Sequence, residues 1–176
     1  MINTRCSWLH GDQRGFRSRD NQLHSSGDYK SPPPPGEHAG LHKYHKERSR
    51  PTVVLPDAER SLIGRKIVTF LRQEGHRVIA VAVGRVHAHV LVNLPDDIRV
   101  VRDVFGEVKR WSSRAVSQTI PGSIWSAGGA FKPIADRNHL HNVYGYILYD
   151  QGRSAWTWSH ADVNDDGMFG RKRPRE

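Results

Sequence analysis

The chain has 176 residues, of which 36% are hydrophobic, and its 27 Lys and Arg against 18 Asp and Glu give a net charge of +9. This length predicts one domain with one modest core, and a single cysteine, Cys6, excludes both a disulfide framework and a cysteine-based zinc site. A positive charge of this size indicates a polyanionic partner, with nucleic acid as the first class to consider.

The sequence also predicts where the protein is found. No apolar run approaches the ~20 residues that a membrane span requires, so we expect no membrane association. The first residues lack the apolar core of a signal peptide. We therefore expect a cytoplasmic, nucleoid-associated protein.

The chain divides by composition into four parts. Residues 10–50 are rich in Gly, Ser, His and basic side chains, show no helical or strand period, and contain a proline run, Pro32–Pro35, that predicts an extended polyproline segment. Residues 1–9 contain the only candidate for a first strand, residues 51–158 form the expected folded domain, and residues 159–176 form a basic polar tail.

From residue 57 the apolar pattern alternates between helical and strand periods. A helix is predicted from Asp57, as its N-cap, to just before Gly75. Two strands follow, over residues 77–83 and 86–94, and the tight connection at Gly84 predicts a hairpin.

A second helix begins after Asp96 and Asp97 and carries an apolar stripe down one side. Residues 124–134 indicate a strand interrupted at its glycines, and a third helix begins at Asp136. With a first strand placed ahead of it, this order matches the split βαβ plan of a ferredoxin-like α+β domain. We expect an antiparallel sheet with helices on one face and a long irregular N-terminal insertion.

Two histidines, His87 and His89, lie in the second predicted strand, VHAHVLV. Residues two apart in a strand point to the same face, so both imidazoles project together while Ala88 and Val90 pack on the other face. Two neutral imidazoles at this spacing can share one metal ion. The alternative is a pair of unrelated, partly exposed histidines in a chain that contains 11.

Other histidine chemistries fit the sequence less well. The H-x-H-x-H strand of histidine-triad nucleotide hydrolases is broken here by Leu91. No second predicted strand carries the H-x-[ST] motif of two-histidine phosphoesterases, and no helix carries H-E-x-x-H.

The third helix carries Tyr146 and, four residues later, Asp150, on one helix face. A phenol oxygen can attack a phosphodiester, and a carboxylate can complete a metal site with two histidines. Tyr144 and Tyr149 lie on other faces, which makes Tyr146 the candidate nucleophile. The alternative is that these tyrosines only pack the helix against a core.

Together these residues resemble the single-tyrosine HUH transposases, the insertion-sequence-200-like and REP-associated group, over about residues 57–152. The resemblance rests on His87-Ala-His89 in a strand, a basic helix ending near Trp111, a Trp125-x-x-Gly-Gly-x-Phe131-Lys132 segment, and Tyr146-Ile-Leu-x-Asp150 in a helix. The early Trp8-Leu9-His10-Gly11-Asp12 stretch also resembles one branch of the family.

The resemblance implies a transposase that uses Mg²⁺ or Mn²⁺ and cleaves hairpin-bearing single-stranded DNA, usually as a homodimer. It implies Tyr146 as the nucleophile, a 5′-phosphotyrosine intermediate and a free 3′-OH. It also implies His87, His89 and Asp150 as metal ligands. The family often has Gln or Asn as the third ligand, and Gln151 is a less well phased substitute for Asp150.

Basic residues of the second helix and of the following segment are expected to contact DNA phosphates. These residues are Lys109, Arg110, Arg114 and Lys132. Trp111 and Trp125 could stack on unpaired bases, with core packing as the alternative for both. The terminal Arg171–Arg175 stretch could add non-specific affinity.

One departure from the family leaves two hypotheses open. Only residues 1–7 precede Trp8, and they alternate poorly, whereas the family begins with a full central strand beside the histidine strand. A shortened strand would loosen the metal site. The chain is therefore either an active transposase or a catalytically degenerate DNA-binding protein derived from one. A relaxase or replication initiator, a third class, usually needs a larger domain.

Overall fold

The computed structural model describes residues 1–12 and 36–161, which belong to two compact units. Of the described residues, the first unit contains 1–4 and 54–161, and the second contains 5–12 and 36–53. The predicted proline run and the tail beyond residue 161 lie outside the described residues.

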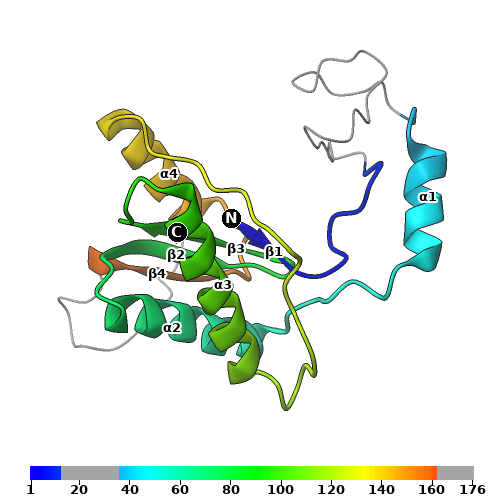
Figure 1. Cartoon of the computed structure of the whole chain (residues 1–176), viewed down its shortest axis with the longest axis horizontal. Coiled ribbons are helices and arrows are strands. Elements are labelled where there is room, and N and C mark those ends of the chain that lie inside the picture. Colours follow the sequence, from blue (N-terminus) through cyan, green and yellow to red (C-terminus); the bar gives the residue numbers. More distant parts are fainter. Residues whose placement is uncertain (13–35, 162–176) are drawn as a thin grey trace. The chain divides into compact units, whose positions relative to one another are not determined.

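The first unit is built on a four-stranded antiparallel sheet in the order β1-β3-β2-β4 (Figure 1). Its strands are β1 (Ile2–Asn3), β2 (Val78–Val83), β3 (His87–Val92) and β4 (Trp156–Ser159). β2 and β3 form the predicted hairpin. β4, which was not among the predicted strands, pairs with the other edge of β2.

β1 lies beside the histidine strand, as the split βαβ plan requires, and Asn3 pairs with His87. On its other side lies the segment predicted as a strand over 124–134, where the Ser126 backbone N–H donates to the Asn3 carbonyl at 2.9 Å. This segment forms no continuous strand, because the chain turns at Gly128, whose φ is +68°. The result is an α+β, ferredoxin-like arrangement.

β1 is shorter than the candidate range of residues 2–9. It ends at Asn3, and the backbone reaches a φ of +58° at Cys6, which a strand does not accommodate. The short strand is nevertheless well held, because Ile2 and Thr4 are fully buried and the Thr4 N–H donates to the Val86 carbonyl at 2.9 Å. Its shortness therefore does not leave the histidine strand without a neighbour.

Three helices complete the first unit: α2 (Asp57–Gln73), α3 (Ile98–Ala115) and α4 (Arg137–Tyr149). Asp97 and Asp136 cap α3 and α4 as predicted, each accepting a backbone N–H at 2.7 Å. α2 has Pro56 at its N-cap, so Asp57 is its first helical residue.

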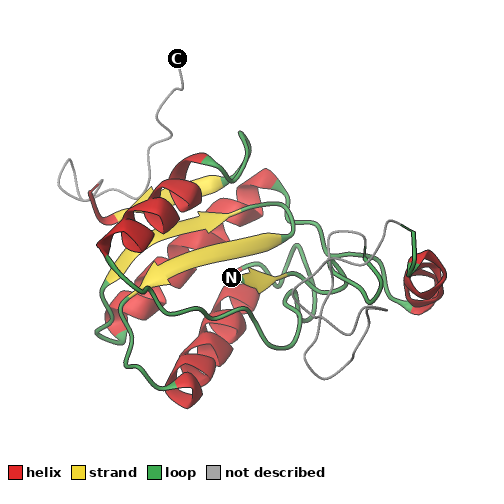
Figure 2. Ribbon diagram, turned by 90° about the horizontal axis from the view of Figure 1, so that it is seen from above, coloured by secondary structure: helices red, strands yellow, loops and turns green. Residues whose placement is uncertain are grey.

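The side chains of β2 alternate between two helix layers. Ala80 and Ala82 form a core cluster with Ile147 of α4. Val81 and Val83 point to the opposite face, which α2 covers, and α3 packs against α2. The helices α2 and α3 of the split βαβ plan thus share one side, while α4 covers the other (Figure 2). Helices therefore cover both faces of the sheet and not the single face predicted, because α4 buries its own apolar side chains on the second face.

The second unit contains one helix, α1 (Ala39–Arg48), among its described residues. The prediction of an irregular stretch over 10–50 does not hold there. None of the side chains of α1 is buried, so hydrophobic periodicity carried no signal. The helix is instead favoured by the intrinsic propensities of its Ala, Leu, Lys, Glu and Arg residues.

Gly64 sets how closely α2 approaches β4, because a Cβ at this position would overlap the ring of Trp156. We expect Gly64→Ala to lower the free energy of unfolding by roughly 1–3 kcal/mol, as measured by urea denaturation. The matched control is Gly106→Ala in α3, where nothing lies within 4 Å of the added methyl group. Alanine should raise the helix stability there by up to about 1 kcal/mol, and equal losses at both positions would contradict this packing.

Candidate functional site

The two histidines of β3 project together beneath α4. His89 pairs with Ala82, whose side chain belongs to the core on the α4 side of the sheet, and His87 lies two residues away on the same face. Their ring centroids are 5.0 Å apart, with the planes at 85°. Two imidazoles that bind one ion at ~2.1 Å from each nitrogen have centroids about 5 Å apart, so the spacing fits a shared ion.

Helix α4 brings Tyr146 to this pair. The Tyr146 ring centroid is 5.3 Å from that of His89, with the planes at 87°. Its neighbour Ile147 is only 2% exposed and anchors α4 in the core, whereas Tyr146 is 48% exposed. The phenol therefore borders the imidazoles and still faces solvent, from where a substrate can approach.

The side-chain amide of Gln151 completes the group. Its Oε1 lies 3.0 Å from the Nε2 of His87, and its Nε2 donates to the Tyr146 carbonyl at 2.9 Å. The second bond fixes the orientation of the amide, so its oxygen faces the imidazole. An amide oxygen and two neutral imidazoles are all suitable ligands for a divalent cation. We call His87, His89, Tyr146 and Gln151 the histidine–tyrosine site.

Asp150, the expected third ligand, does not join this site. It is exposed and forms the C-cap of α4, where its backbone N–H donates to the Tyr146 carbonyl at 3.2 Å. Within residues 1–12 and 36–161, no three His, Cys, Asp or Glu side chains are grouped to hold a metal.

The helix end explains this difference. Asp150 lies beyond the last helical residue, Tyr149, and the chain turns at Gly152, whose φ is +85°. Helical phasing therefore stops predicting side-chain positions there, and the longer Gln151 side chain folds back toward His87. The sequence signal for Gln151 was its amide side chain directly before Gly152, where the chain turns.

Burial holds His89 in its neutral form. Desolvation, and after it the positive charges of His87 and of the Met1 amino group, lower its pKa from 6.5 to about 4. A neutral imidazole has a free lone pair, which is the form that binds metal ions. His89 is therefore ready to act as a ligand at neutral pH.

Two of the four predicted phosphate contacts already have partners within the protein. The Lys109 ammonium donates to the carbonyls of Ser126, at 2.8 Å, and Gly128, and its burial lowers its pKa. Lys109 thus holds the segment that flanks β1. Arg110 forms an exposed ion pair with Glu107.

The other basic residues remain open to solvent. Lys132 and Arg114 are exposed, and the Arg114 guanidinium lies 5.3 Å from the ring centroid of Trp111. Arg114 belongs to α3, which packs on α2 rather than on α4. Trp125 is a core residue, 4% exposed, and its indole N–H donates to Ser112 Oγ at 2.8 Å.

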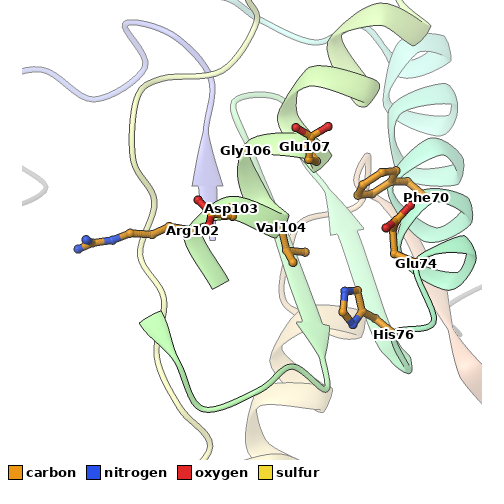
Figure 3. A pocket seen from close by; sticks show the side chains of 8 residues that line it. All are labelled: Phe70, Glu74, His76, Arg102, Asp103, Val104, Gly106 and Glu107. Atoms are coloured by element: carbon orange, nitrogen blue, oxygen red, sulfur yellow. The ribbon is translucent and has the colours of Figure 1, made fainter. Parts of the chain in front are cut away.

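A hollow of about 480 Å³ lies apart from the histidine–tyrosine site, between the C-terminal end of α2 and α3 (Figure 3). It is lined by Phe70, Glu74, His76, Arg102, Asp103, Val104, Gly106 and Glu107. None of the residues predicted to be functional is among them. Its lining mixes acidic, basic and apolar side chains, so its chemistry selects no class of ligand.

Comparisons of the chain with protein-family models, with curated proteins and with solved structures found no match. In the part of the chain that the structure describes, no helix has both the length and the apolar character needed to cross a membrane.

His89 should make folding depend on pH below neutrality. Its pKa is about 4 in the folded protein and ~6.5 in an unfolded chain, so between these values the unfolded state binds more protons. Its contribution to stability is therefore complete above pH ~6.5 and is lost as the pH falls toward 4.

This can be measured on metal-free protein in EDTA. We expect His89→Gln to reduce the slope of unfolding free energy against pH within that window, with a constant difference between the two proteins above pH ~7. An imidazole NMR titration of the native protein should place the midpoint of His89 near 4. A midpoint near ~6.5 would contradict the burial effect.

Proposed function

We propose that this chain is a single-stranded-DNA transposase that cuts and rejoins DNA through Tyr146. The observation that carries this proposal is the convergence of a phenol, two imidazoles and an amide oxygen from β3 and α4. The order of motifs that resembles the single-tyrosine HUH transposases supports it further. The net charge of +9 suits a polyanionic substrate.

His87, His89 and Gln151 would hold Mg²⁺ or Mn²⁺. The residues fit such an ion, since both imidazoles share one side of β3 and the Gln151 oxygen is held toward His87 by the bond to the Tyr146 carbonyl. Second bonds of this kind orient metal ligands. The ion would polarise the scissile phosphate and offset charge in the transition state. In this proposal Gln151 takes the place of Asp150.

Tyr146 acts as the nucleophile. Its Oη forms a bond to the scissile phosphorus as the phenol loses its proton, and the bond from phosphorus to the 3′ oxygen breaks. That oxygen takes up a proton and leaves as a free 3′-OH, while the 5′ phosphate stays on the tyrosine. Attack by a 3′-OH on this phosphotyrosine reverses the step, joins two strands and restores the phenol.

The basic residues suggest how the strand is held. Lys132 follows the segment that flanks β1. Burial, and after it the charges of Lys109 and Lys132, lower the pKa of the Met1 amino group, whose own charge acts on His89. Of these two lysines Lys132 is the exposed one, whereas Lys109 donates to backbone carbonyls, so we assign Lys132 the phosphate contact on this side of the protein. Arg110 and Arg114 would contact DNA further away, on α3. A hairpin in the substrate and a homodimer enter this proposal through the resemblance alone, and a cytoplasmic, nucleoid-associated location enters it through the sequence expectations given above.

A covalent adduct tests the proposal. Purified protein mixed with labelled single-stranded DNA from the flanks of its own gene, plus Mn²⁺, should give a protein–DNA band on a denaturing gel. Tyr146→Phe and His87→Ala should abolish the band, because they remove the nucleophile and a ligand. Tyr149→Phe is the matched control, since Tyr149 lies on the same helix and is 57% exposed.

The outcomes separate the two hypotheses that the sequence leaves open. An adduct that survives Tyr146→Phe, or that is lost equally in Tyr149→Phe, would contradict the assignment of the nucleophile. If no divalent metal produces an adduct while the protein still binds the DNA, the chain is a catalytically degenerate DNA-binding protein.

The third ligand has its own test. Gln151→Ala should lower the rate of adduct formation by about 10–100-fold and raise the Mn²⁺ concentration needed for half-maximal rate. Asp150→Ala should leave both quantities nearly unchanged, because its side chain lies outside the site. The reverse ranking would restore Asp150 as the ligand.

A further inference from the structure

The strand beside the histidine strand is too short to hold its place alone. β1 has two residues, whereas strands in folded proteins usually have about three to ten. It pairs with β3 at Ile2 and Asn3, and Asn3 lies opposite His87. The contacts that keep β1 in this register therefore also fix the backbone from which the His87 imidazole projects.

Residues 125–130, which we call the flanking segment, supply contacts on the other side of β1. The Ser126 backbone N–H donates to the Asn3 carbonyl at 2.9 Å, and the Ser126 hydroxyl donates to the Thr4 carbonyl at 2.8 Å. Thr4 also forms an isolated antiparallel bridge with Trp125. The flanking segment is therefore a second neighbour for β1, although it forms no continuous strand.

Helix α3 holds the flanking segment at two points. The Lys109 ammonium donates to the carbonyls of Ser126, at 2.8 Å, and Gly128. About one turn later, Ser112 Oγ accepts the indole N–H of Trp125 at 2.8 Å. Both Ser112 and Trp125 are buried, so solvent does not compete for the second bond.

These contacts form a continuous path from α3 to a ligand of the proposed metal site. The path runs from Lys109 and Ser112 to the flanking segment, from there to β1, and across the strand pair to His87. Each step is a hydrogen bond or a strand pairing within the first unit. Groups that orient metal ligands from outside affect both metal affinity and activity.

We propose that Lys109 is a positioning residue for the histidine–tyrosine site. Together with Ser112 it holds the flanking segment against β1, and β1 keeps the histidine strand in place. This inference rests on the proposed function, because it assigns Lys109 a part in the geometry of that site. It replaces the phosphate contact that the sequence predicted for Lys109. Burial, which lowers the pKa of Lys109, agrees with an ammonium directed toward the protein.

Amide hydrogen exchange tests the structural part of the proposal. Lys109→Met removes the ammonium and keeps the apolar stem of the side chain. We expect the amides of Thr4 and Ser126, which donate to Val86 and Asn3, to exchange about tenfold faster, since bonds to a charged group are lost. The amides of α2 and β2 should be unchanged, because the opening is local. Equal acceleration throughout the first unit would overturn the proposal.

Metal binding tests the functional part. In protein without DNA, Lys109→Met should bind Mn²⁺ about tenfold more weakly, the lower end of the loss expected when a group that supports metal ligands is removed. Lys109→Arg should restore most of the affinity, because a guanidinium also donates to carbonyls. Arg102→Met is the matched control, since it removes an exposed cation from the same helix. It should change neither the amide exchange nor the affinity for Mn²⁺.

DNA binding in EDTA distinguishes a positioning residue from a phosphate contact. The probe is labelled single-stranded DNA from the flanks of the protein's own gene. A lost phosphate contact weakens binding and reduces the slope of log K against log salt by about 0.7. We expect Lys132→Met to change both quantities and Lys109→Met to change neither. A reduced slope in Lys109→Met together with unchanged amide exchange would overturn the proposal.

The failure of this inference and the failure of the proposed function give different results. If the parent protein binds neither Mn²⁺ nor DNA, the proposed function fails, and the amide exchange of Lys109→Met alone decides whether Lys109 holds β1. If the parent binds Mn²⁺ and Lys109→Met binds it equally well with unchanged exchange, the proposed function stands and this inference fails.

Ser112→Ala tests the second point of attachment, and it decides the question if Lys109→Met does not fold. Alanine has a higher helix propensity than serine, so the substitution does not weaken α3 itself. The Trp125 indole N–H loses its acceptor, so the same amides should exchange faster and the affinity for Mn²⁺ should fall. Unchanged exchange and affinity, with circular dichroism that matches the parent, would overturn the proposal.

Discussion

The pairing of β3 with β1 on one side and β2 on the other fixes the histidine–tyrosine site. Asn3 faces His87 and Ala82 faces His89, so the register of both ladders directs the two imidazoles toward α4. A slip of one residue would turn both toward α2, because side chains alternate between faces along a strand. The same register buries Ala88 on the opposite side, where an imidazole would not fit.

Helix α4 packs on that sheet face through its apolar side chains. The same helix therefore contributes residues to both the core and the site. Ile147 packs on Ala80 and Ala82, while Tyr146, one residue earlier, stands at the rim beside His89. The position of the phenol thus depends on core packing rather than on any polar contact of its own. The burial of Ile147 therefore determines where the Tyr146 phenol lies.

Local signals made most of the first unit predictable. Periodicity and N-caps identified α2, β2, β3, α3 and α4, and strand alternation alone placed the histidines together. Three features escaped, each for a different reason. β4 is a short strand defined by its pairing with β2, β1 is cut short by the backbone at Cys6, and α1 buries no side chain that periodicity could detect. Gln151 was ranked below Asp150 because helical phasing, which ends one residue before Asp150, favours Asp150.

With Gln151 rather than Asp150 as the third ligand, all three ligands of the proposed metal site are neutral. Two imidazoles and an amide are neutral ligands, and burial keeps His89 uncharged. A divalent ion held by them would keep its full charge toward an incoming phosphodiester, whereas a carboxylate ligand would neutralise half of it. Neutral ligands also bind the ion less tightly. In this proposal the charge of the DNA backbone would help to retain the cation. The affinity for metal should therefore rise when single-stranded DNA is bound.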